Sequence, residues 1–95
     1  MLYTLSRSPY ACDLAALLRT VQAGDDLLLL ADGVIAGLIG SPALHELSAS
    51  PLTLFSLEND VAARGLFAYF SHDFVIISYT DFVKLTEKQT KQIAW

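Results

Sequence analysis

Short apolar runs recur along the chain at nearly regular intervals, at residues 1–6, 27–31, 52–57 and 74–78. Their starts lie about 22–26 residues apart, which is the spacing of repeated strand–helix units. Residues 27–30 and 74–77 show no alternation of apolar and polar positions, as is typical of strands buried on both faces of a parallel sheet. The tail, residues 93–95, is also apolar and is expected to add either a last short strand or a plug. We therefore expect a mostly parallel sheet of four to five strands.

Apolar positions three and four residues apart predict helices between these runs. For the first helix, Ser8 and Pro9 are start signals and Gly24 is the end signal. The second helical segment is broken at Ser41 and Pro42, so we expect one short turn, a kink and a second short helix.

Two further helices follow the third and fourth apolar runs. We expect one over residues 59–66 and another from about residue 80 to residue 89, with Phe82, Val83 and Leu85 buried. Right-handed crossovers place helices on both faces of such a sheet. The sequence therefore predicts one α/β domain, residues 1–95, folded as a three-layer α/β/α sandwich.

The composition is unusually apolar for a chain of 95 residues, with 54% hydrophobic residues and a mean hydropathy of +0.46. A membrane-spanning helix needs about 20 consecutive apolar residues, and the longest run without charge, residues 33–45, is shorter and contains glycine and proline. The start does not resemble a signal peptide. We therefore expect a soluble, cytoplasmic protein whose apolar surface is covered by partner chains; the alternative is a monomer with an apolar surface.

The formal net charge of −4 argues against direct binding of nucleic acid by this chain alone. Lys84, Lys88 and Lys91 cluster near the end, but Glu87 lies among them, so we interpret them as a solvated helix face. The single cysteine cannot form an internal disulfide, which fits a reducing compartment.

Cys12 is the first candidate for chemistry. It is expected just inside the first turn of the first helix, where the helix N-terminus would stabilise a thiolate. The neighbouring Asp13 opposes this, and no histidine or lysine is close in sequence. A small packed thiol is therefore the favoured interpretation, and a sulfur-carrying Cys12 is the lower-ranked one.

Other cofactor and metal signals are missing from the sequence. His45 and His72 lack metal-ligand spacing, and two distant histidines with one cysteine make a poor zinc site. No phosphate-binding glycine loop or nucleophile elbow is present. We expect no cofactor and no metal.

Ligands of such sheets bind beyond the carboxyl ends of the strands, which predicts a site among residues 7–9, 32–33, 58–60 and 79–81. Paired carboxylates there could perform acid–base chemistry, although carboxylates at helix starts usually cap amides. The carboxylates concerned are Asp32, Glu58, Asp60 and Asp81. Arg64 is expected to pair with Glu58 and Asp60, or to reach a partner chain.

Four blocks in order resemble the TusB/DsrH family over essentially the whole chain. They are residues 2–9 (LYTLSRSP), residues 27–34 (LLLLADGV), Leu57 and Asp60 with residues 63–66 (ARGL), and residues 79–86 (YTDFVKLT) followed by residues 92–95 (QIAW). The resemblance implies a DsrE/DsrF/DsrH-like fold. It also implies a cytoplasmic heterohexamer of two heterotrimers with TusC-like and TusD-like subunits.

In that family the complex relays persulfide sulfur to tRNA. The resemblance implies transfer from a TusA-like carrier through a TusD-like cysteine to a TusE-like carrier, for 2-thiouridine synthesis by the thiouridylase MnmA at the wobble position. This chain would then be a non-catalytic structural subunit and not an enzyme.

Two departures from the family pattern limit what can be transferred. Tyr3 stands where the family usually has histidine, and residues 14–20 lack the cysteine that DsrH relatives often place there. Two alternatives stay open: a persulfide-carrying sulfurtransferase subunit that uses Cys12, and a small-molecule binding module at the strand ends.

Overall fold

The computed structural model describes residues 1–95 and contains one sheet of five strands. The strands are β1 (Leu2–Leu5), β2 (Asp26–Leu29), β3 (Thr53–Leu57), β4 (Val75–Ile77) and β5 (Gln92–Ala94). Every neighbouring pair is parallel, and the order across the sheet is β4-β3-β2-β1-β5. The predicted strands are confirmed in position, including the strand formed by the tail. Burial on both faces is wrong for residues 74–77, because β4 is an edge strand on which the Val75 side chain is 54% exposed.

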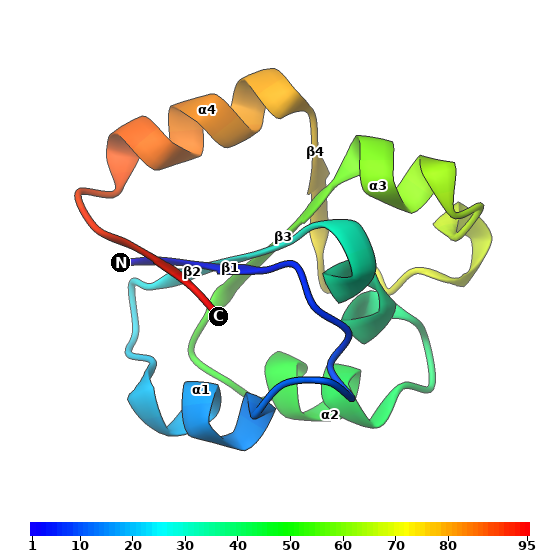
Figure 1. Cartoon of the computed structure of the whole chain (residues 1–95), viewed down its shortest axis with the longest axis horizontal. Coiled ribbons are helices and arrows are strands. Elements are labelled where there is room, and N and C mark those ends of the chain that lie inside the picture. Colours follow the sequence, from blue (N-terminus) through cyan, green and yellow to red (C-terminus); the bar gives the residue numbers. More distant parts are fainter.

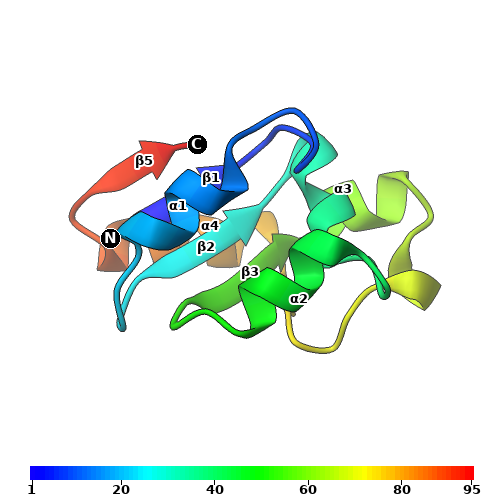
Figure 2. The same ribbon diagram turned by 90° about the horizontal axis from the view of Figure 1, so that it is seen from below.

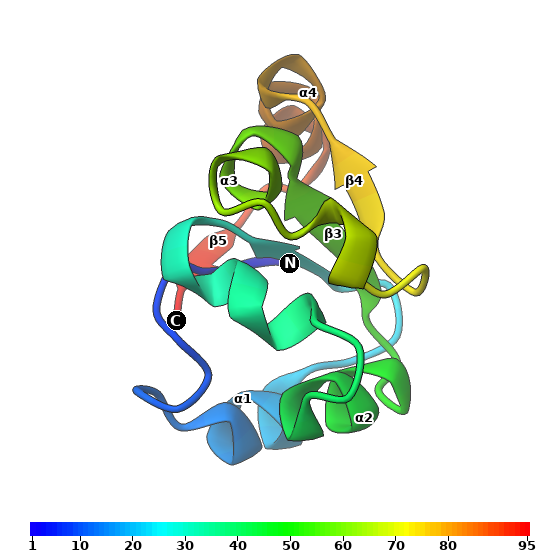
Figure 3. The ribbon, with the colours of Figure 1, turned by 90° about the vertical axis from the view of Figure 1, so that its right-hand side faces the viewer.

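The helices lie on both sides of this sheet. They are α1 (Leu14–Thr20), α2 (Pro42–Ser48), α3 (Glu58–Ala63) and α4 (Tyr79–Lys88), with 3-10 helices η1 (Ala31–Gly37) and η2 (Phe67–Tyr69). Figure 1 shows α1 and α2 below the sheet and α3 and α4 above it, and Figure 3 shows the same layers from the side. The three-layer α/β/α prediction is confirmed. None of the helices is long and apolar enough to cross a membrane.

Alternate strand residues fill two cores of different size. The larger core of 15 buried residues joins the sheet to α1, α2 and η1, and includes Leu17, Leu27 and Leu47. The smaller core lies under α4 and contains Leu2, Leu28, Ile77 and Leu85. Residues 27–29 are buried throughout because their side chains point alternately into these two cores.

The start of the first helix differs from the prediction. The helix begins at Leu14, because the Asp13 carboxylate accepts a hydrogen bond from the Ala16 amide at 3.0 Å and caps it. The Ser8 hydroxyl instead accepts from the Tyr10 amide at 3.2 Å, within a turn that precedes the helix. At the other end, α1 stops at Thr20, and Gly24 lies in the turn before β2 with a φ of +93°.

The predicted break in the second helical segment is confirmed, since η1 ends before Ser41 and α2 starts at Pro42. Gly33 is required within η1, because a Cβ at that position would lie 1.9 Å from the Leu5 backbone oxygen. Glycine therefore lets η1 pack directly against the carboxyl end of β1.

The prediction for the last helix is correct except at one residue. Leu85 is buried and Phe82 is half-buried, but the Val83 side chain is 39% exposed. The predicted burial of Val83 is wrong. Val83 lies two residues before Leu85 on the helix, and this offset turns the Val83 side chain away from the sheet.

Candidate functional site

The direction of the chain across the sheet reverses once, between β1 and β5. Strands β1 to β4 follow one another to one side, and α4 then leads back across the sheet to place β5 on the other side of β1. Figure 2 shows β5 beside β1 at this edge. In open parallel sheets, ligands bind outside the carboxyl ends of the strands at such a switch point.

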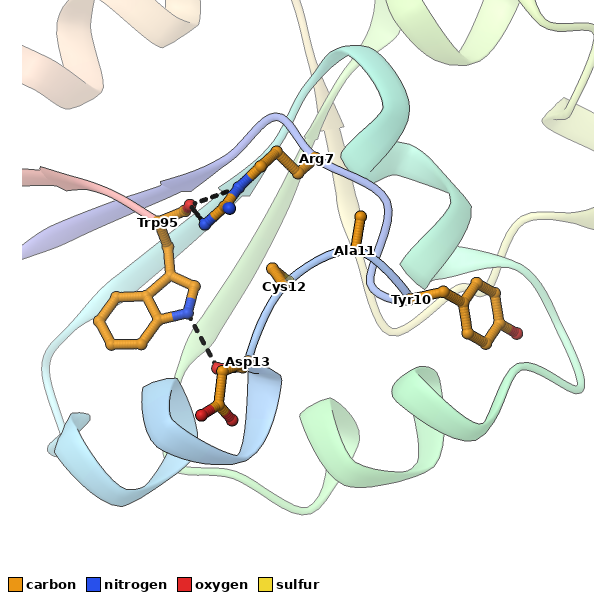
Figure 4. Close-up of a pocket in the computed structure, with 6 residues that line it drawn as sticks. All are labelled: Arg7, Tyr10, Ala11, Cys12, Asp13 and Trp95. Carbon is orange, nitrogen blue, oxygen red and sulfur yellow. Dashed lines mark hydrogen bonds between the residues drawn. The ribbon is translucent and has the colours of Figure 1, made fainter.

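A pocket lies at this switch point. It has a volume of about 690 Å³, and its lining residues are Arg7, Tyr10, Ala11, Cys12, Asp13 and Trp95. Figure 4 shows that the first five come from the loop between β1 and α1, whereas Trp95 follows β5. Of the four segments predicted from the strand ends, only residues 7–9 contribute to this pocket, and they do so through Arg7 alone.

Trp95 forms one wall of the pocket and is held from several directions. Its backbone amide donates to the Thr4 oxygen at 2.8 Å, and its indole Nε1 donates to the Asp13 oxygen at 3.0 Å. The Arg7 guanidinium donates from Nε to the Trp95 backbone oxygen at 3.1 Å and also from Nη2. The Tyr3 ring meets the indole edge-on, with centroids 6.5 Å apart. No local pattern of residues predicts the contact between Arg7 and Trp95, which are 88 residues apart.

Cys12 is half-buried and lies outside α1. It precedes the capping residue Asp13, so the prediction that Cys12 sits in the first helical turn is wrong. Its Sγ is 4.0 Å from the Pro9 backbone oxygen, and its side chain packs against the larger core. Cys12 therefore lies before the helix amides that were expected to stabilise a thiolate. It remains a candidate for sulfur chemistry because it lines the pocket.

Two of the four predicted carboxylates meet at Arg64. Its Nη2 is 3.0 Å from Asp32, and its Nη1 is 4.0 Å from Asp60. Asp60 also accepts a hydrogen bond from the Ala31 amide at 2.7 Å. Glu58 makes no ion pair with Arg64, so that half of the predicted pairing is wrong. Asp32 and Asp60 thus bind the Arg64 guanidinium, and Asp60 also binds a backbone amide. Carboxylates engaged in this way typically stabilise the fold.

The remaining candidates are separate from this site. Asp81 lies in the first turn of α4, and its amide donates to the Ser78 hydroxyl at 3.1 Å. His45 and His72 are exposed. No three His, Cys, Asp or Glu side chains come close enough to hold a metal ion.

Residues 7–92 match the family model described as DsrH like protein. The chain belongs to the TusB/DsrH family. Protein TusB of Sodalis glossinidius (strain morsitans) is 75% identical over 95 residues, which is 100% of both chains. Protein TusB of Serratia proteamaculans (strain 568) is 58% identical over the same length.

Solved structures show the same fold at low sequence identity. The ychN protein from E. coli superimposes with a TM-score of 0.77 at 17% identity, covering 99% of this chain and 97% of that one. MTH1491 from Methanobacterium thermoautotrophicum gives a TM-score of 0.75 at 12% identity, covering 99% and 96%. The TusB/DsrH chain therefore shares its architecture with a wider set of proteins.

Proposed function

We propose that this TusB/DsrH chain is a non-catalytic structural subunit of a TusBCD-type sulfurtransferase complex. The complex would relay persulfide sulfur for 2-thiouridine synthesis at the tRNA wobble position in the cytoplasm. The observation that carries this proposal is the full-length similarity to proteins named TusB.

The geometry of the charged groups agrees with a non-catalytic role. Arg7 is engaged by Trp95, and Arg64 is engaged by Asp32 and Asp60. An acid–base catalyst needs a titratable group in reach of a substrate and with a pKa near the working pH. Arg7, Arg64, Asp32 and Asp60 bind one another or the backbone instead, which supports a structural role. From the family resemblance, we propose that a TusD-like subunit supplies the sulfur-carrying cysteine.

The exposed apolar side chains suit a chain that is covered by other subunits. Ile39, Phe67 and Tyr69 are 63%, 50% and 65% exposed. Two of them adjoin, since the Ile39 amide donates to the Tyr69 oxygen at 2.8 Å. Aromatic residues are enriched at protein interfaces. The proposed direct partners are TusC-like and TusD-like subunits in a heterohexamer, with TusA-like and TusE-like carriers as indirect partners and no direct contact with nucleic acid.

Co-expression with the TusC-like and TusD-like chains of the same organism tests this proposal. Native mass spectrometry of the purified sample should show a complex with two copies of each chain. Recovery of this chain only as a free monomer, while the other two chains assemble, would contradict the proposal.

A second candidate function rests on Cys12 in the pocket wall. In this alternative, the Cys12 thiolate attacks the outer sulfur of a donor persulfide, the sulfur–sulfur bond of the donor breaks, and the donor leaves as a thiolate. Intact-mass measurement after incubation with a persulfide donor should then show one added sulfur atom, absent in Cys12→Ser. An unmodified wild-type chain would eliminate this candidate.

A further inference from the structure

Residues 90–95 form a segment with little burial at the edge of the sheet. None of the six is buried, and only Ile93 and Trp95 are half-buried. Their strand β5 is at the edge of the sheet and pairs over three residues with β1 alone. Segments with few buried contacts and one-sided backbone pairing open at a lower free energy than the rest of a protein.

The chain is anchored firmly just before this segment. Gln89 donates from Nε2 to the carboxylate of Asp26 at 2.6 Å and accepts from the Met1 amine at 2.8 Å. Asp26 is 3% exposed, so this contact holds the end of α4 against the sheet. The boundary between the anchored end of α4 and the edge segment therefore lies directly after Gln89.

The contacts at the far end of the segment converge on Trp95. Arg7, Thr4 and the backbone of Asp13 all bind it, and each of them belongs to β1 or to the pocket loop. Trp95 is therefore both the end of the segment and a wall of the pocket (Figure 4). Arg7 is exposed and makes no hydrogen bond to the rest of the protein, so its side chain acts on this segment only.

We propose that residues 90–95 are a strap that opens and closes over the pocket at the carboxyl end of β1. Its hinge lies directly after Gln89, and the hydrogen bonds from Arg7 to Trp95 hold it closed. In the closed state Trp95 completes the pocket wall and β5 covers the edge of β1. In the open state the pocket loses that wall and the β1 edge becomes accessible.

Trp95 is the only tryptophan, so its fluorescence reports on the strap directly. Arg7→Ala removes the side-chain hydrogen bonds to the Trp95 backbone oxygen. Arg19→Ala is the matched control, because Arg19 is exposed on α1 and makes no hydrogen bond or ion pair. We expect acrylamide to quench Trp95 several-fold more strongly in Arg7→Ala than in wild type, and Arg19→Ala to behave as wild type.

Hydrogen exchange followed by mass spectrometry separates strap opening from global unfolding. In Arg7→Ala, residues 92–95 should exchange about tenfold faster than in wild type, while β2 is unchanged, because only the strap has a lower opening free energy. Two results would overturn the proposal: identical quenching and exchange in Arg7→Ala and wild type, or equal acceleration in the strap and in β2.

Discussion

The Asp60 carboxylate holds Ala31 in a left-handed backbone conformation. Its Oδ2 accepts the Ala31 amide at 2.7 Å, and Ala31 is the one residue other than glycine with a positive φ, at +50°. A side chain with a Cβ reaches this region at a cost of roughly 1–2 kcal/mol. The contact therefore fixes the sharp turn between β2 and η1 from the neighbouring helix α3.

Asp60→Ala should lower the free energy of unfolding by about 1–3 kcal/mol, because the half-buried Ala31 amide loses its acceptor and Arg64 loses a partner. Urea denaturation measures the change. Glu58→Ala is the control on the same helix turn, since Glu58 is exposed and should change stability by less than about 0.5 kcal/mol. Equal losses in the two variants would show that the Asp60 contact does not hold this turn.

Gly33→Ala should be one of the most damaging small substitutions in the chain. The added methyl group would collide with the backbone of Leu5, which cannot move without breaking β1 pairing. We expect a loss of about 3 kcal/mol or more in thermal or urea unfolding.

The comparison for that variant is Gly24→Ala. No atom lies within 4 Å of the new Cβ there, and only the φ of +93° opposes the change, so the loss should be about 1 kcal/mol. A Gly33→Ala protein as stable as Gly24→Ala would mean that η1 does not pack on β1 as described.

Tyr3 should contribute to the alkaline limit of stability. Burial in the core, and secondly the charge of Asp25, raise the pKa of the Tyr3 phenol above its ordinary value of 10.0. The unfolded chain then loses this proton first, so the stabilisation is complete below pH 10 and is lost as the pH rises through the folded-state pKa.

Tyr3→Phe removes this titration and leaves the ring in the core. Urea unfolding from pH 8 to about pH 11 should show a shallower loss of stability in Tyr3→Phe than in wild type. Tyr10→Phe is the control, because the Tyr10 side chain is 74% exposed. Parallel curves for wild type and Tyr3→Phe would contradict the assigned shift.

The sequence predicted what depends on local patterns. Residues 27–30 indicated a central strand because a fully apolar run fits only a strand covered on both sides, and residues 27–29 are indeed buried. Ser41 and Pro42 marked the helix break because a proline both ends one segment and begins the next.

The errors arose where two local signals compete or where partners are far apart in sequence. Ser8 and Asp13 are both good helix caps, and only the folded path of the loop makes Asp13 the cap. Arg7 and Trp95 are 88 residues apart, and Asp32 and Arg64 are 32 apart. No periodicity reports such pairs, so the pocket wall and the Arg64 contacts became visible only in the folded chain.

The 2-thiouridine content of tRNA would show whether this chain, as proposed, serves as a structural subunit without a reactive group of its own. A strain without its TusB-type subunit would be complemented with wild type or with Cys12→Ser, and the nucleoside would be quantified by mass spectrometry. We predict the same restored level for both chains and none for the empty vector. Loss of 2-thiouridine with a Cys12→Ser chain that is present at the wild-type level and still assembles would overturn the proposed non-catalytic role.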